Sequence, residues 1–456
     1  MRSGLVNRRL LEFSLSRALS LCTLLAPLAA RAVDPVAPAP QTTAPQTTAA
    51  SAGLERVTFS EALQRALARN PSVRIAEQEI LRAEALVRQA QASWLPTLAG
   101  NASYTRLDDD RTSTTGTPPK TNTLAPKDQL GANLQLVVPL FAPGRWLASR
   151  RAGQAADVQR LTAQDQRRQV GLATGRAFLS VVAARRLVEV AERARVSAAD
   201  HERFSSTRLQ GGLGNRLDQV RAAQDLAATE AALQTQQVAQ SRAREALALL
   251  AGADHPLDAA DDPGLPLPPQ LSDALEQARA RADVASQQRR LEVAEQLLAD
   301  RWSLYAPLLT AAFQPFLQYP ALLTTPAAGW QAQLLLTIPL YDGGLRYGQI
   351  REQRALAAEA REQLEAALRQ AGSEVRAAFE ALRYTDLALA SSQRAAQLAG
   401  ESLKLSTEAY QAGATTELDV LDAARRSRDA DASAATSEDA ARQARLELLA
   451  AAGRFP

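Results

Sequence analysis

The sequence predicts a mainly α-helical fold with membrane-type β-strands, arranged as an internal duplication. The chain has only 4% aromatic residues and is rich in Ala, Gln, Arg and Glu, which favours long helices over a compact α/β core. Its hydrophobic residues change from a period of two to mixed spacings of three and four, as expected when strands give way to helices. Its motifs also recur in the same order roughly 200 residues further along the chain, which indicates a duplicated, domain-sized unit.

The first 32 residues have the three parts of a secretory signal peptide. An arginine-bearing start precedes an apolar run, and Ala30-Arg31-Ala32 fits an A-x-A cleavage site. A lipoprotein signal is the alternative because Cys22 lies in the apolar run, although Leu21 stands where such a signal carries a small residue. The sequence therefore predicts export, with residues 33–53 as a disordered Pro/Thr/Ala-rich leader.

Removal of this segment changes the chemistry available to the chain. Cys22 is the only cysteine, so the mature chain has no thiol for disulfides, thiolate metal sites or nucleophilic attack. The formal net charge of +3 also becomes slightly negative, because the segment carries five arginines and one glutamate. We therefore expect no nucleic-acid partner, no metal and no cofactor.

Each predicted repeat starts with helices. In the first repeat, Thr58-Phe-Ser-Glu61 is typical of a capping box, and Asn70-Pro71 is typical of an N-cap followed by proline at the first helical position. The second repeat lacks that break and reads Arg281-Ala-Asp-Val284. The repeats are placed at residues 54–262 and 263–456.

Strand-like alternation follows the first helices of each repeat. Strands are predicted near residues 98–107, 130–140, 308–319 and 330–340, each about ten residues long, which is the span of a tilted transmembrane strand. Polar, turn-rich segments link the strands of each pair. Aromatic residues follow the strand ends, where a membrane-interface girdle is expected: Phe141, Trp146, Tyr341 and Tyr347.

Very long helical stretches complete each repeat. They are predicted at residues 144–209, 217–250, 345–412 and 418–451, and the longer ones reach roughly 100 Å at ~1.5 Å per residue. Antiparallel coiled-coil hairpins are the natural arrangement for such stretches. Their tips are predicted at glycines, where a residue free to take positive φ is needed: Gly211, Gly212, Gly214 and Gly413.

This order of elements resembles the outer-membrane efflux protein family, the TolC-like channels. The most specific stretch, from Tyr410 through Gln-Ala-Gly-Ala-Thr-Thr-Glu-Leu-Asp-Val-Leu to Asp422, is similar to the hairpin tip of that family's second repeat. The resemblance implies a homotrimer whose chains each give four strands to a twelve-stranded β-barrel in the outer membrane. It also implies an α-barrel tunnel across the periplasm that works with a periplasmic adaptor and an inner-membrane pump.

The resemblance also implies roles for residues at the tip. By position, Asp419 and Asp422 form the channel constriction, and Tyr410 hydrogen-bonds to Asp218. Thr415 stands where the family's best-known member has an arginine, and Leu217 cannot supply the hydroxyl of that second link. From the residues themselves, two acids three positions apart share a helical face, and threefold symmetry would make a ring of six carboxylates. A solvated helix face is the alternative.

Catalysis finds little support in the sequence. His201 and His255 are the only histidines, and neither has metal-ligand spacing to a second ligand, so both are interpreted as bystanders. The predicted function is an exit duct for small-molecule efflux or type I protein secretion. The alternative is an exported coiled-coil adaptor or scaffold, which would need no membrane strands.

Overall fold

The computed structural model describes residues 54–260, 262–322 and 325–455. The chain divides into two units, and every described residue belongs to the second, Gly53–Pro456. The predicted signal peptide, its Cys22 and the predicted leader lie outside the described residues.

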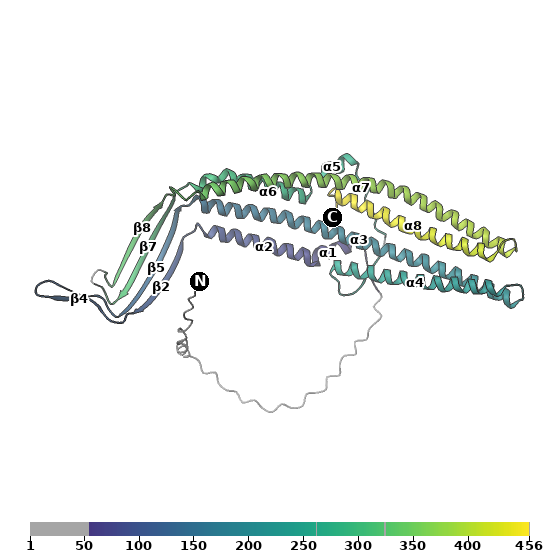
Figure 1. Ribbon diagram of the computed structural model, residues 1–456, viewed down its shortest axis with the longest axis horizontal. Coiled ribbons are helices and arrows are strands. Elements are labelled where there is room, and N and C mark those ends of the chain that lie inside the picture. Colours follow the sequence, from purple (N-terminus) through teal and green to yellow (C-terminus); the bar gives the residue numbers. More distant parts are fainter. Residues whose placement is uncertain (1–53, 261, 323–324, 456) are drawn as a thin grey trace, which may run out of the picture. The chain divides into compact units, whose positions relative to one another are not determined.

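Two long helical hairpins make up most of this unit (Figure 1). Helices α3 (Pro143–Gln210) and α4 (Arg216–Ala251) form the first, and α7 (Leu345–Gln411) and α8 (Glu417–Ala451) form the second. Within each hairpin the two helices pack along their length, and α3 also packs against α8. The long helical stretches predicted from the sequence therefore form two hairpins, and the second hairpin lies against the first.

Shorter helices precede the strands of each repeat. They are α1 (Phe59–Arg69) and α2 (Pro71–Ala92) in the first repeat, and α5 (Leu271–Ala278), α6 (Ala282–Ala299) and the 3₁₀ turn η1 (Asp300–Leu304) in the second. Thr58 caps α1 by accepting from the Glu61 backbone, but the Glu61 carboxylate accepts from Arg65, so only half of the predicted capping box forms. Asn70 caps α2 as predicted, with Pro71 at its first position.

The four long strands form one antiparallel sheet in the order β2-β5-β7-β8. Their bounds are Thr97–Arg106, Asp128–Phe141, Leu308–Tyr319 and Ala328–Thr337. The central pair, β5 and β7, comes from different repeats, and β2 and β8 are the two edges. The duplicated strand pairs therefore meet in a single sheet.

The pairing register separates the sheet into two chemically different faces. Because neighbouring side chains along a strand point to opposite faces, cross-strand partners share a face. One face carries Asn101 hydrogen-bonded to Asn133 (3.0 Å) and Gln331 hydrogen-bonded to Gln314 (2.7 Å). The opposite face is almost wholly apolar and includes Leu98, Leu134, Leu136, Phe313, Leu317, Trp330, Leu334 and Leu336.

Two small pairs of strands escaped sequence prediction. The segment predicted as a turn-rich link contains a hairpin of β3 (Arg111–Thr115) and β4 (Lys120–Ala125). In addition, β1 (Glu55–Val57) pairs in parallel with β6 (Leu257–Ala259). Three residues are too few for a visible alternation, so this pair leaves little periodic signal in the sequence.

The packed core follows the duplication. One cluster belongs to the first repeat and centres on Val57, Phe178 and Leu247. A second belongs to the second repeat and centres on Val284, Val375 and Leu448. A third cluster, which contains Leu179, Leu446, Leu449 and Phe455, joins α3 to α8 and thus packs the repeats together.

Within the described residues, no helix is both long enough and apolar enough to cross a membrane. The fold class predicted from the sequence, long helical hairpins with four long strands in an internal duplication, is confirmed.

Candidate functional site at the hairpin tips

The first hairpin tip uses its glycines in different ways. Gly212 has φ +72° and reverses the chain, whereas Gly211 has φ −77°. Gly214 does not take a positive φ, but a Cβ there would lie 2.8 Å from the Leu209 nitrogen. Gly212 thus supplies the positive φ expected at this turn, whereas Gly211 and Gly214 do not, and close backbone packing explains Gly214. At the second tip, Gly413 has φ +76°, as expected.

Thr416 caps α8, the helix that follows the second tip, and Asp419 is the third residue of that helix. The Asp419 side chain accepts hydrogen bonds from the capping segment. Its Oδ2 atom accepts from the Thr416 hydroxyl (2.6 Å), the Thr415 hydroxyl (2.7 Å) and the Thr416 backbone nitrogen (3.0 Å). Thr416 in turn accepts from the Asp419 nitrogen, which completes a capping box. These hydrogen bonds lower the pKa of Asp419 to about 2, so its carboxylate stays charged at neutral pH.

Asp422 lies one turn further along α8. It forms an ion pair with Arg426 at 2.7 Å, and both Asp419 and Asp422 are exposed. Val420 and Ala423 are the buried residues of this turn, so the two acids face away from the packed side of the helix. Both carboxylates are therefore exposed at the surface of the chain, although each has partners within it.

A buried acid, Glu417, lies beside these exposed ones. Its side chain is only 2% exposed, although Leu418 next to it is 58% exposed. Its Oε1 atom is 2.5 Å from His201 Nε2 and accepts from the Ser205 hydroxyl at 3.2 Å. These contacts join the first turn of α8 to α3.

Tyr410 completes the contacts at the tip. Burial, together with the neighbouring Glu417 carboxylate, raises the pKa of Tyr410 to about 12. Its ring packs against His201 and Phe204, and the Arg208 guanidinium lies 5.0 Å from the ring centre. The phenol therefore stays protonated at neutral pH.

The predicted link between Tyr410 and Asp218 differs in the structure. Both residues are described by the structure, and no hydrogen bond joins their side chains. Asp218 instead lies 3.9 Å from Arg221. Glu417, the buried first residue of α8, is the acid that acts most strongly on the tyrosine, and Asp218 acts on it more weakly through its charge.

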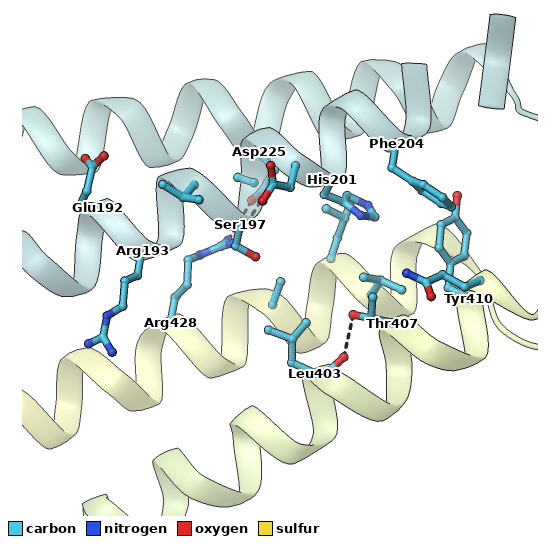
Figure 2. Close-up of a pocket in the computed structure, with 17 residues that line it drawn as sticks. Glu192, Arg193, Ser197, His201, Phe204, Asp225, Leu403, Thr407, Tyr410 and Arg428 are labelled. Carbon is cyan, nitrogen blue, oxygen red and sulfur yellow. Dashed lines mark hydrogen bonds and ion pairs between the residues drawn. The ribbon is translucent and has the colours of Figure 1, made fainter. Parts of the chain in front are cut away.

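A cavity of about 630 Å³ separates the two hairpins behind the tip. Figure 2 shows side chains of α3, α4, α7 and α8 around it, among them His201, Asp225, Tyr410 and Arg428. Arg428 and Asp225 form a two-pronged ion pair across the hairpins, at 2.8 and 3.1 Å. Arg428 and Asp225 therefore line this space, and so does His201, which pairs with Glu417.

The predicted interface aromatics lie where the strands meet the helices. Phe141 and Trp146 pack edge to face with ring centres 5.5 Å apart, and Tyr341 and Tyr347 are 89% and 78% exposed. All four are free to contact surroundings outside the chain.

The described residues were also searched for groups that could hold a metal ion. Across the ranges that the structure describes, no group of three or more His, Cys, Asp or Glu residues could hold a metal ion. The run Asp108-Asp109-Asp110 is used locally: Asp108 pairs with Arg111, and Asp110 accepts from the Lys127 backbone.

Known structures share this fold over most of their length. VceC of Vibrio cholerae, an outer membrane protein, matches with 21% identity and a TM-score of 0.72 over 87% of this chain and 96% of that chain. CusC matches with 19% identity and a TM-score of 0.75 over 88% and 93%. The open state of the MtrE outer membrane channel of Neisseria gonorrhoeae matches with 19% identity and a TM-score of 0.72 over 87% and 88%. The fold is thus that of the TolC-like outer-membrane channels.

The sequence comparison agrees with this class. Residues 62–253 match the family model described as Outer membrane efflux protein. The resemblance to the outer-membrane efflux protein family is therefore confirmed, and members of that family are channels rather than enzymes. A comparison with curated protein sequences finds no significant match.

Sequence reasoning missed Glu417, and it interpreted His201 as a bystander. The two residues are more than two hundred positions apart, so no local spacing links them. The first residue of a helix after a tip is normally solvated, so only the packing of the hairpins reveals that Glu417 is buried.

Proposed function

We propose that the chain is the subunit of an outer-membrane channel that serves as an exit duct for efflux. The observation that carries this proposal is the two-faced sheet. Its apolar face includes Leu98 (69% exposed), Leu317 (63%), Trp330 (69%) and Leu334 (66%), and a contiguous exposed apolar surface of this kind requires a lipid or protein environment. The polar opposite face suits a water-filled interior.

The open edges of the sheet support assembly of several copies. Strands β2 and β8 each pair on one side only, and unpaired backbone groups are unstable in lipid. Closing three four-stranded sheets into one twelve-stranded barrel satisfies every edge. A homotrimer is therefore the assembly that we propose, with the aromatic residues Phe141, Trp146, Tyr341 and Tyr347 at the membrane interface.

In this assembly the helical hairpins form the duct across the periplasm. Asp419 and Asp422 from three copies would surround the axis at its inner end and favour cations there. In this proposal a periplasmic adaptor and an inner-membrane pump supply the energy and choose the substrate. Small molecules and unfolded proteins delivered by type I secretion are both compatible with such a passive duct.

The alternative, a periplasmic adaptor or scaffold, would not need an apolar sheet face. Two neighbouring residues of β8 test the difference because they lie on opposite faces. Leu334 pairs with Ala311 on the apolar face, and Gln333 pairs with Ala312 on the polar face.

We expect the wild-type protein to fractionate with outer membranes as an SDS-resistant or detergent-stable trimer and to conduct ions in planar bilayers. Leu334→Arg should abolish membrane insertion, because an arginine on a lipid-facing strand costs about 2 to 4 kcal/mol near the bilayer centre. Gln333→Arg is the matched control and should insert normally. A soluble monomeric product, or equal effects of the two variants, would contradict the proposal.

A further inference from the structure

The polar face of the four-stranded sheet carries no charged side chain. The register assigns this face to alternate residues of β2, β5, β7 and β8, among them Asn133 and Gln331. Charged residues make up 22% of the whole chain, yet the only two in these strands, Arg106 and Asp128, are cross-strand partners on the opposite face. The absence of charge is therefore a specific property of the polar face.

Amide side chains make this face polar. The Asn101 amide donates to Asn133 at 3.0 Å, and the Gln331 amide donates to Gln314 at 2.7 Å, so each pair joins two neighbouring strands. An amide has both donors and an acceptor but no net charge, so it can be hydrated without attracting ions of either sign. The amide residues of the face are Asn101, Gln129, Asn133, Gln135, Gln314, Gln318, Gln331 and Gln333.

One aromatic residue, Phe316, also lies on the polar face. It pairs with Asn133 on one side and with Gly329 on the other. A Cβ atom at position 329 would be 2.8 Å from Phe316 Cζ, so the ring can lie against β8 only because residue 329 has no side chain. The ring is therefore packed against the sheet and adds no charge to its surface.

The acids at the second hairpin tip are too distant to give this face a charge. The 67 residues of α7 lie between the end of β8 and that tip. At ~1.5 Å per residue, this helix is about 100 Å long. Charges in physiological salt are screened over about 8 to 10 Å, so Asp419 and Asp422 do not affect the potential at the sheet.

We infer that the sheet gives the outer-membrane section of the duct an uncharged, amide-lined wall, which lets cations, anions and neutral solutes pass without discrimination by charge. The inference rests on the proposed channel function, because that function places the polar face in the water-filled interior. It adds that this section suits cargo of either charge.

The test measures the electrostatic potential beside the wall with a reporter thiol. Cys22 is the only cysteine of the sequence and lies in the predicted signal peptide, so Gln331→Cys supplies a single reactive thiol in the exported protein. Outer-membrane fractions and the detergent-stable trimer are reacted with a cationic and an anionic methanethiosulfonate of similar size. Each rate is divided by the rate of the same reagent with free mercaptoethanol.

An uncharged wall should give normalised rates that agree within about twofold for the two reagents, because distant charges are screened. Adding Gln314→Glu places a carboxylate beside the thiol, and the cationic reagent should then react about threefold or more faster than the anionic one. Gln314→Asn is the matched neutral control. A greater preference than this twofold in the Gln331→Cys protein or in its Gln314→Asn control, or no preference after Gln314→Glu, overturns the inference.

Leu334→Cys separates this inference from the channel function. Leu334 lies on the apolar face, so in outer-membrane fractions both charged reagents should react with this cysteine about tenfold or more slowly than with Gln331→Cys. Equal rates at the two positions would contradict the channel function. A charge preference at Gln331→Cys, together with a slowly reacting Leu334→Cys, would refute the uncharged wall and leave the channel function standing.

Discussion

Asn70 and Arg281 occupy equivalent positions in the two repeats and hold the same kind of partner. The Asn70 side-chain amide donates to the Leu250 carbonyl at 3.0 Å, at the end of α4, and Arg281 donates to the Ala451 carbonyl at 3.3 Å, at the end of α8. The second repeat lacks the Asn-Pro sequence but has the same link between the start of one helix and the end of another.

Arg281 should therefore be a strong determinant of stability. It is 5% exposed and also binds Asp283 and Glu374. We expect Arg281→Ala to lower the free energy of unfolding by about 2 kcal/mol, because it removes a buried guanidinium that donates to the Ala451 carbonyl and to two partly exposed carboxylates. Denaturant unfolding in detergent measures this. Arg289→Ala is the control because its ion pair is more exposed, and it should lower the free energy of unfolding by less than about 1 kcal/mol. Equal losses of stability in the two variants would show that burial of the arginine does not determine its contribution.

The tip glycines predict opposite responses to alanine. Gly214→Ala should loosen the last turn of α3, because its Cβ would lie 2.8 Å from the Leu209 nitrogen, and overpacking costs about 1 to 3 kcal/mol. Gly211→Ala should be tolerated, because its nearest neighbour would be the Thr207 oxygen at 3.5 Å. Faster amide exchange at residues 207–212 in the first variant alone is the expected result. Similar exchange in both would refute this account.

Asp439 should make stability depend on pH. Burial raises its pKa from 3.8 to about 6, so between these values the folded state binds more protons than the unfolded state. The free energy of unfolding should therefore fall as pH rises from 4 to 6. Asp439→Asn keeps an acceptor for Gln443 and should stabilise the protein at pH 7 by on the order of 1 kcal/mol, with no gain at pH 4. Asp429→Asn, exposed on the same helix, is the control, and a gain at both pH values would assign the effect to something other than titration.

Charge and helix capping can be separated at the proposed constriction. Asp419→Asn keeps an acceptor for Thr415 and Thr416 but removes the charge, whereas Asp419→Ala removes both. Combined with Asp422→Asn, the first change should raise conductance or weaken block by polyvalent cations. Because the pKa of Asp419 is about 2, block of the wild type should vary little between pH 5 and 8 on account of this residue. If the variant shows the same conductance and the same cation block as the wild type in bilayer recordings, neither acid contributes to the constriction.

The long helices and strands could be predicted from the sequence because their hydrophobic periodicity extends over many residues. Helix α3, predicted at 144–209, spans Pro143–Gln210, and β7 matches its predicted range of 308–319. The contacts at the hairpin tips could not be predicted in this way, because they join single residues that are far apart in the sequence and leave no periodic pattern. Asp218 lies on α4 and Glu417 on α8, so which acid lies beside Tyr410 depends on how the two hairpin tips pack, and the hydrophobic pattern of neither helix reveals that.

The unpaired edges of the sheet affect the order in which the chain can assemble and enter a membrane. A single copy exposes the unpaired backbone of β2 and β8, and each unsatisfied group costs several kcal/mol in lipid. One copy alone would therefore be a poor membrane species, and the same edges in water are templates for aggregation. Trimer formation and entry into the bilayer should thus be coupled events, and the concentration of unassembled chains should limit how fast functional protein appears.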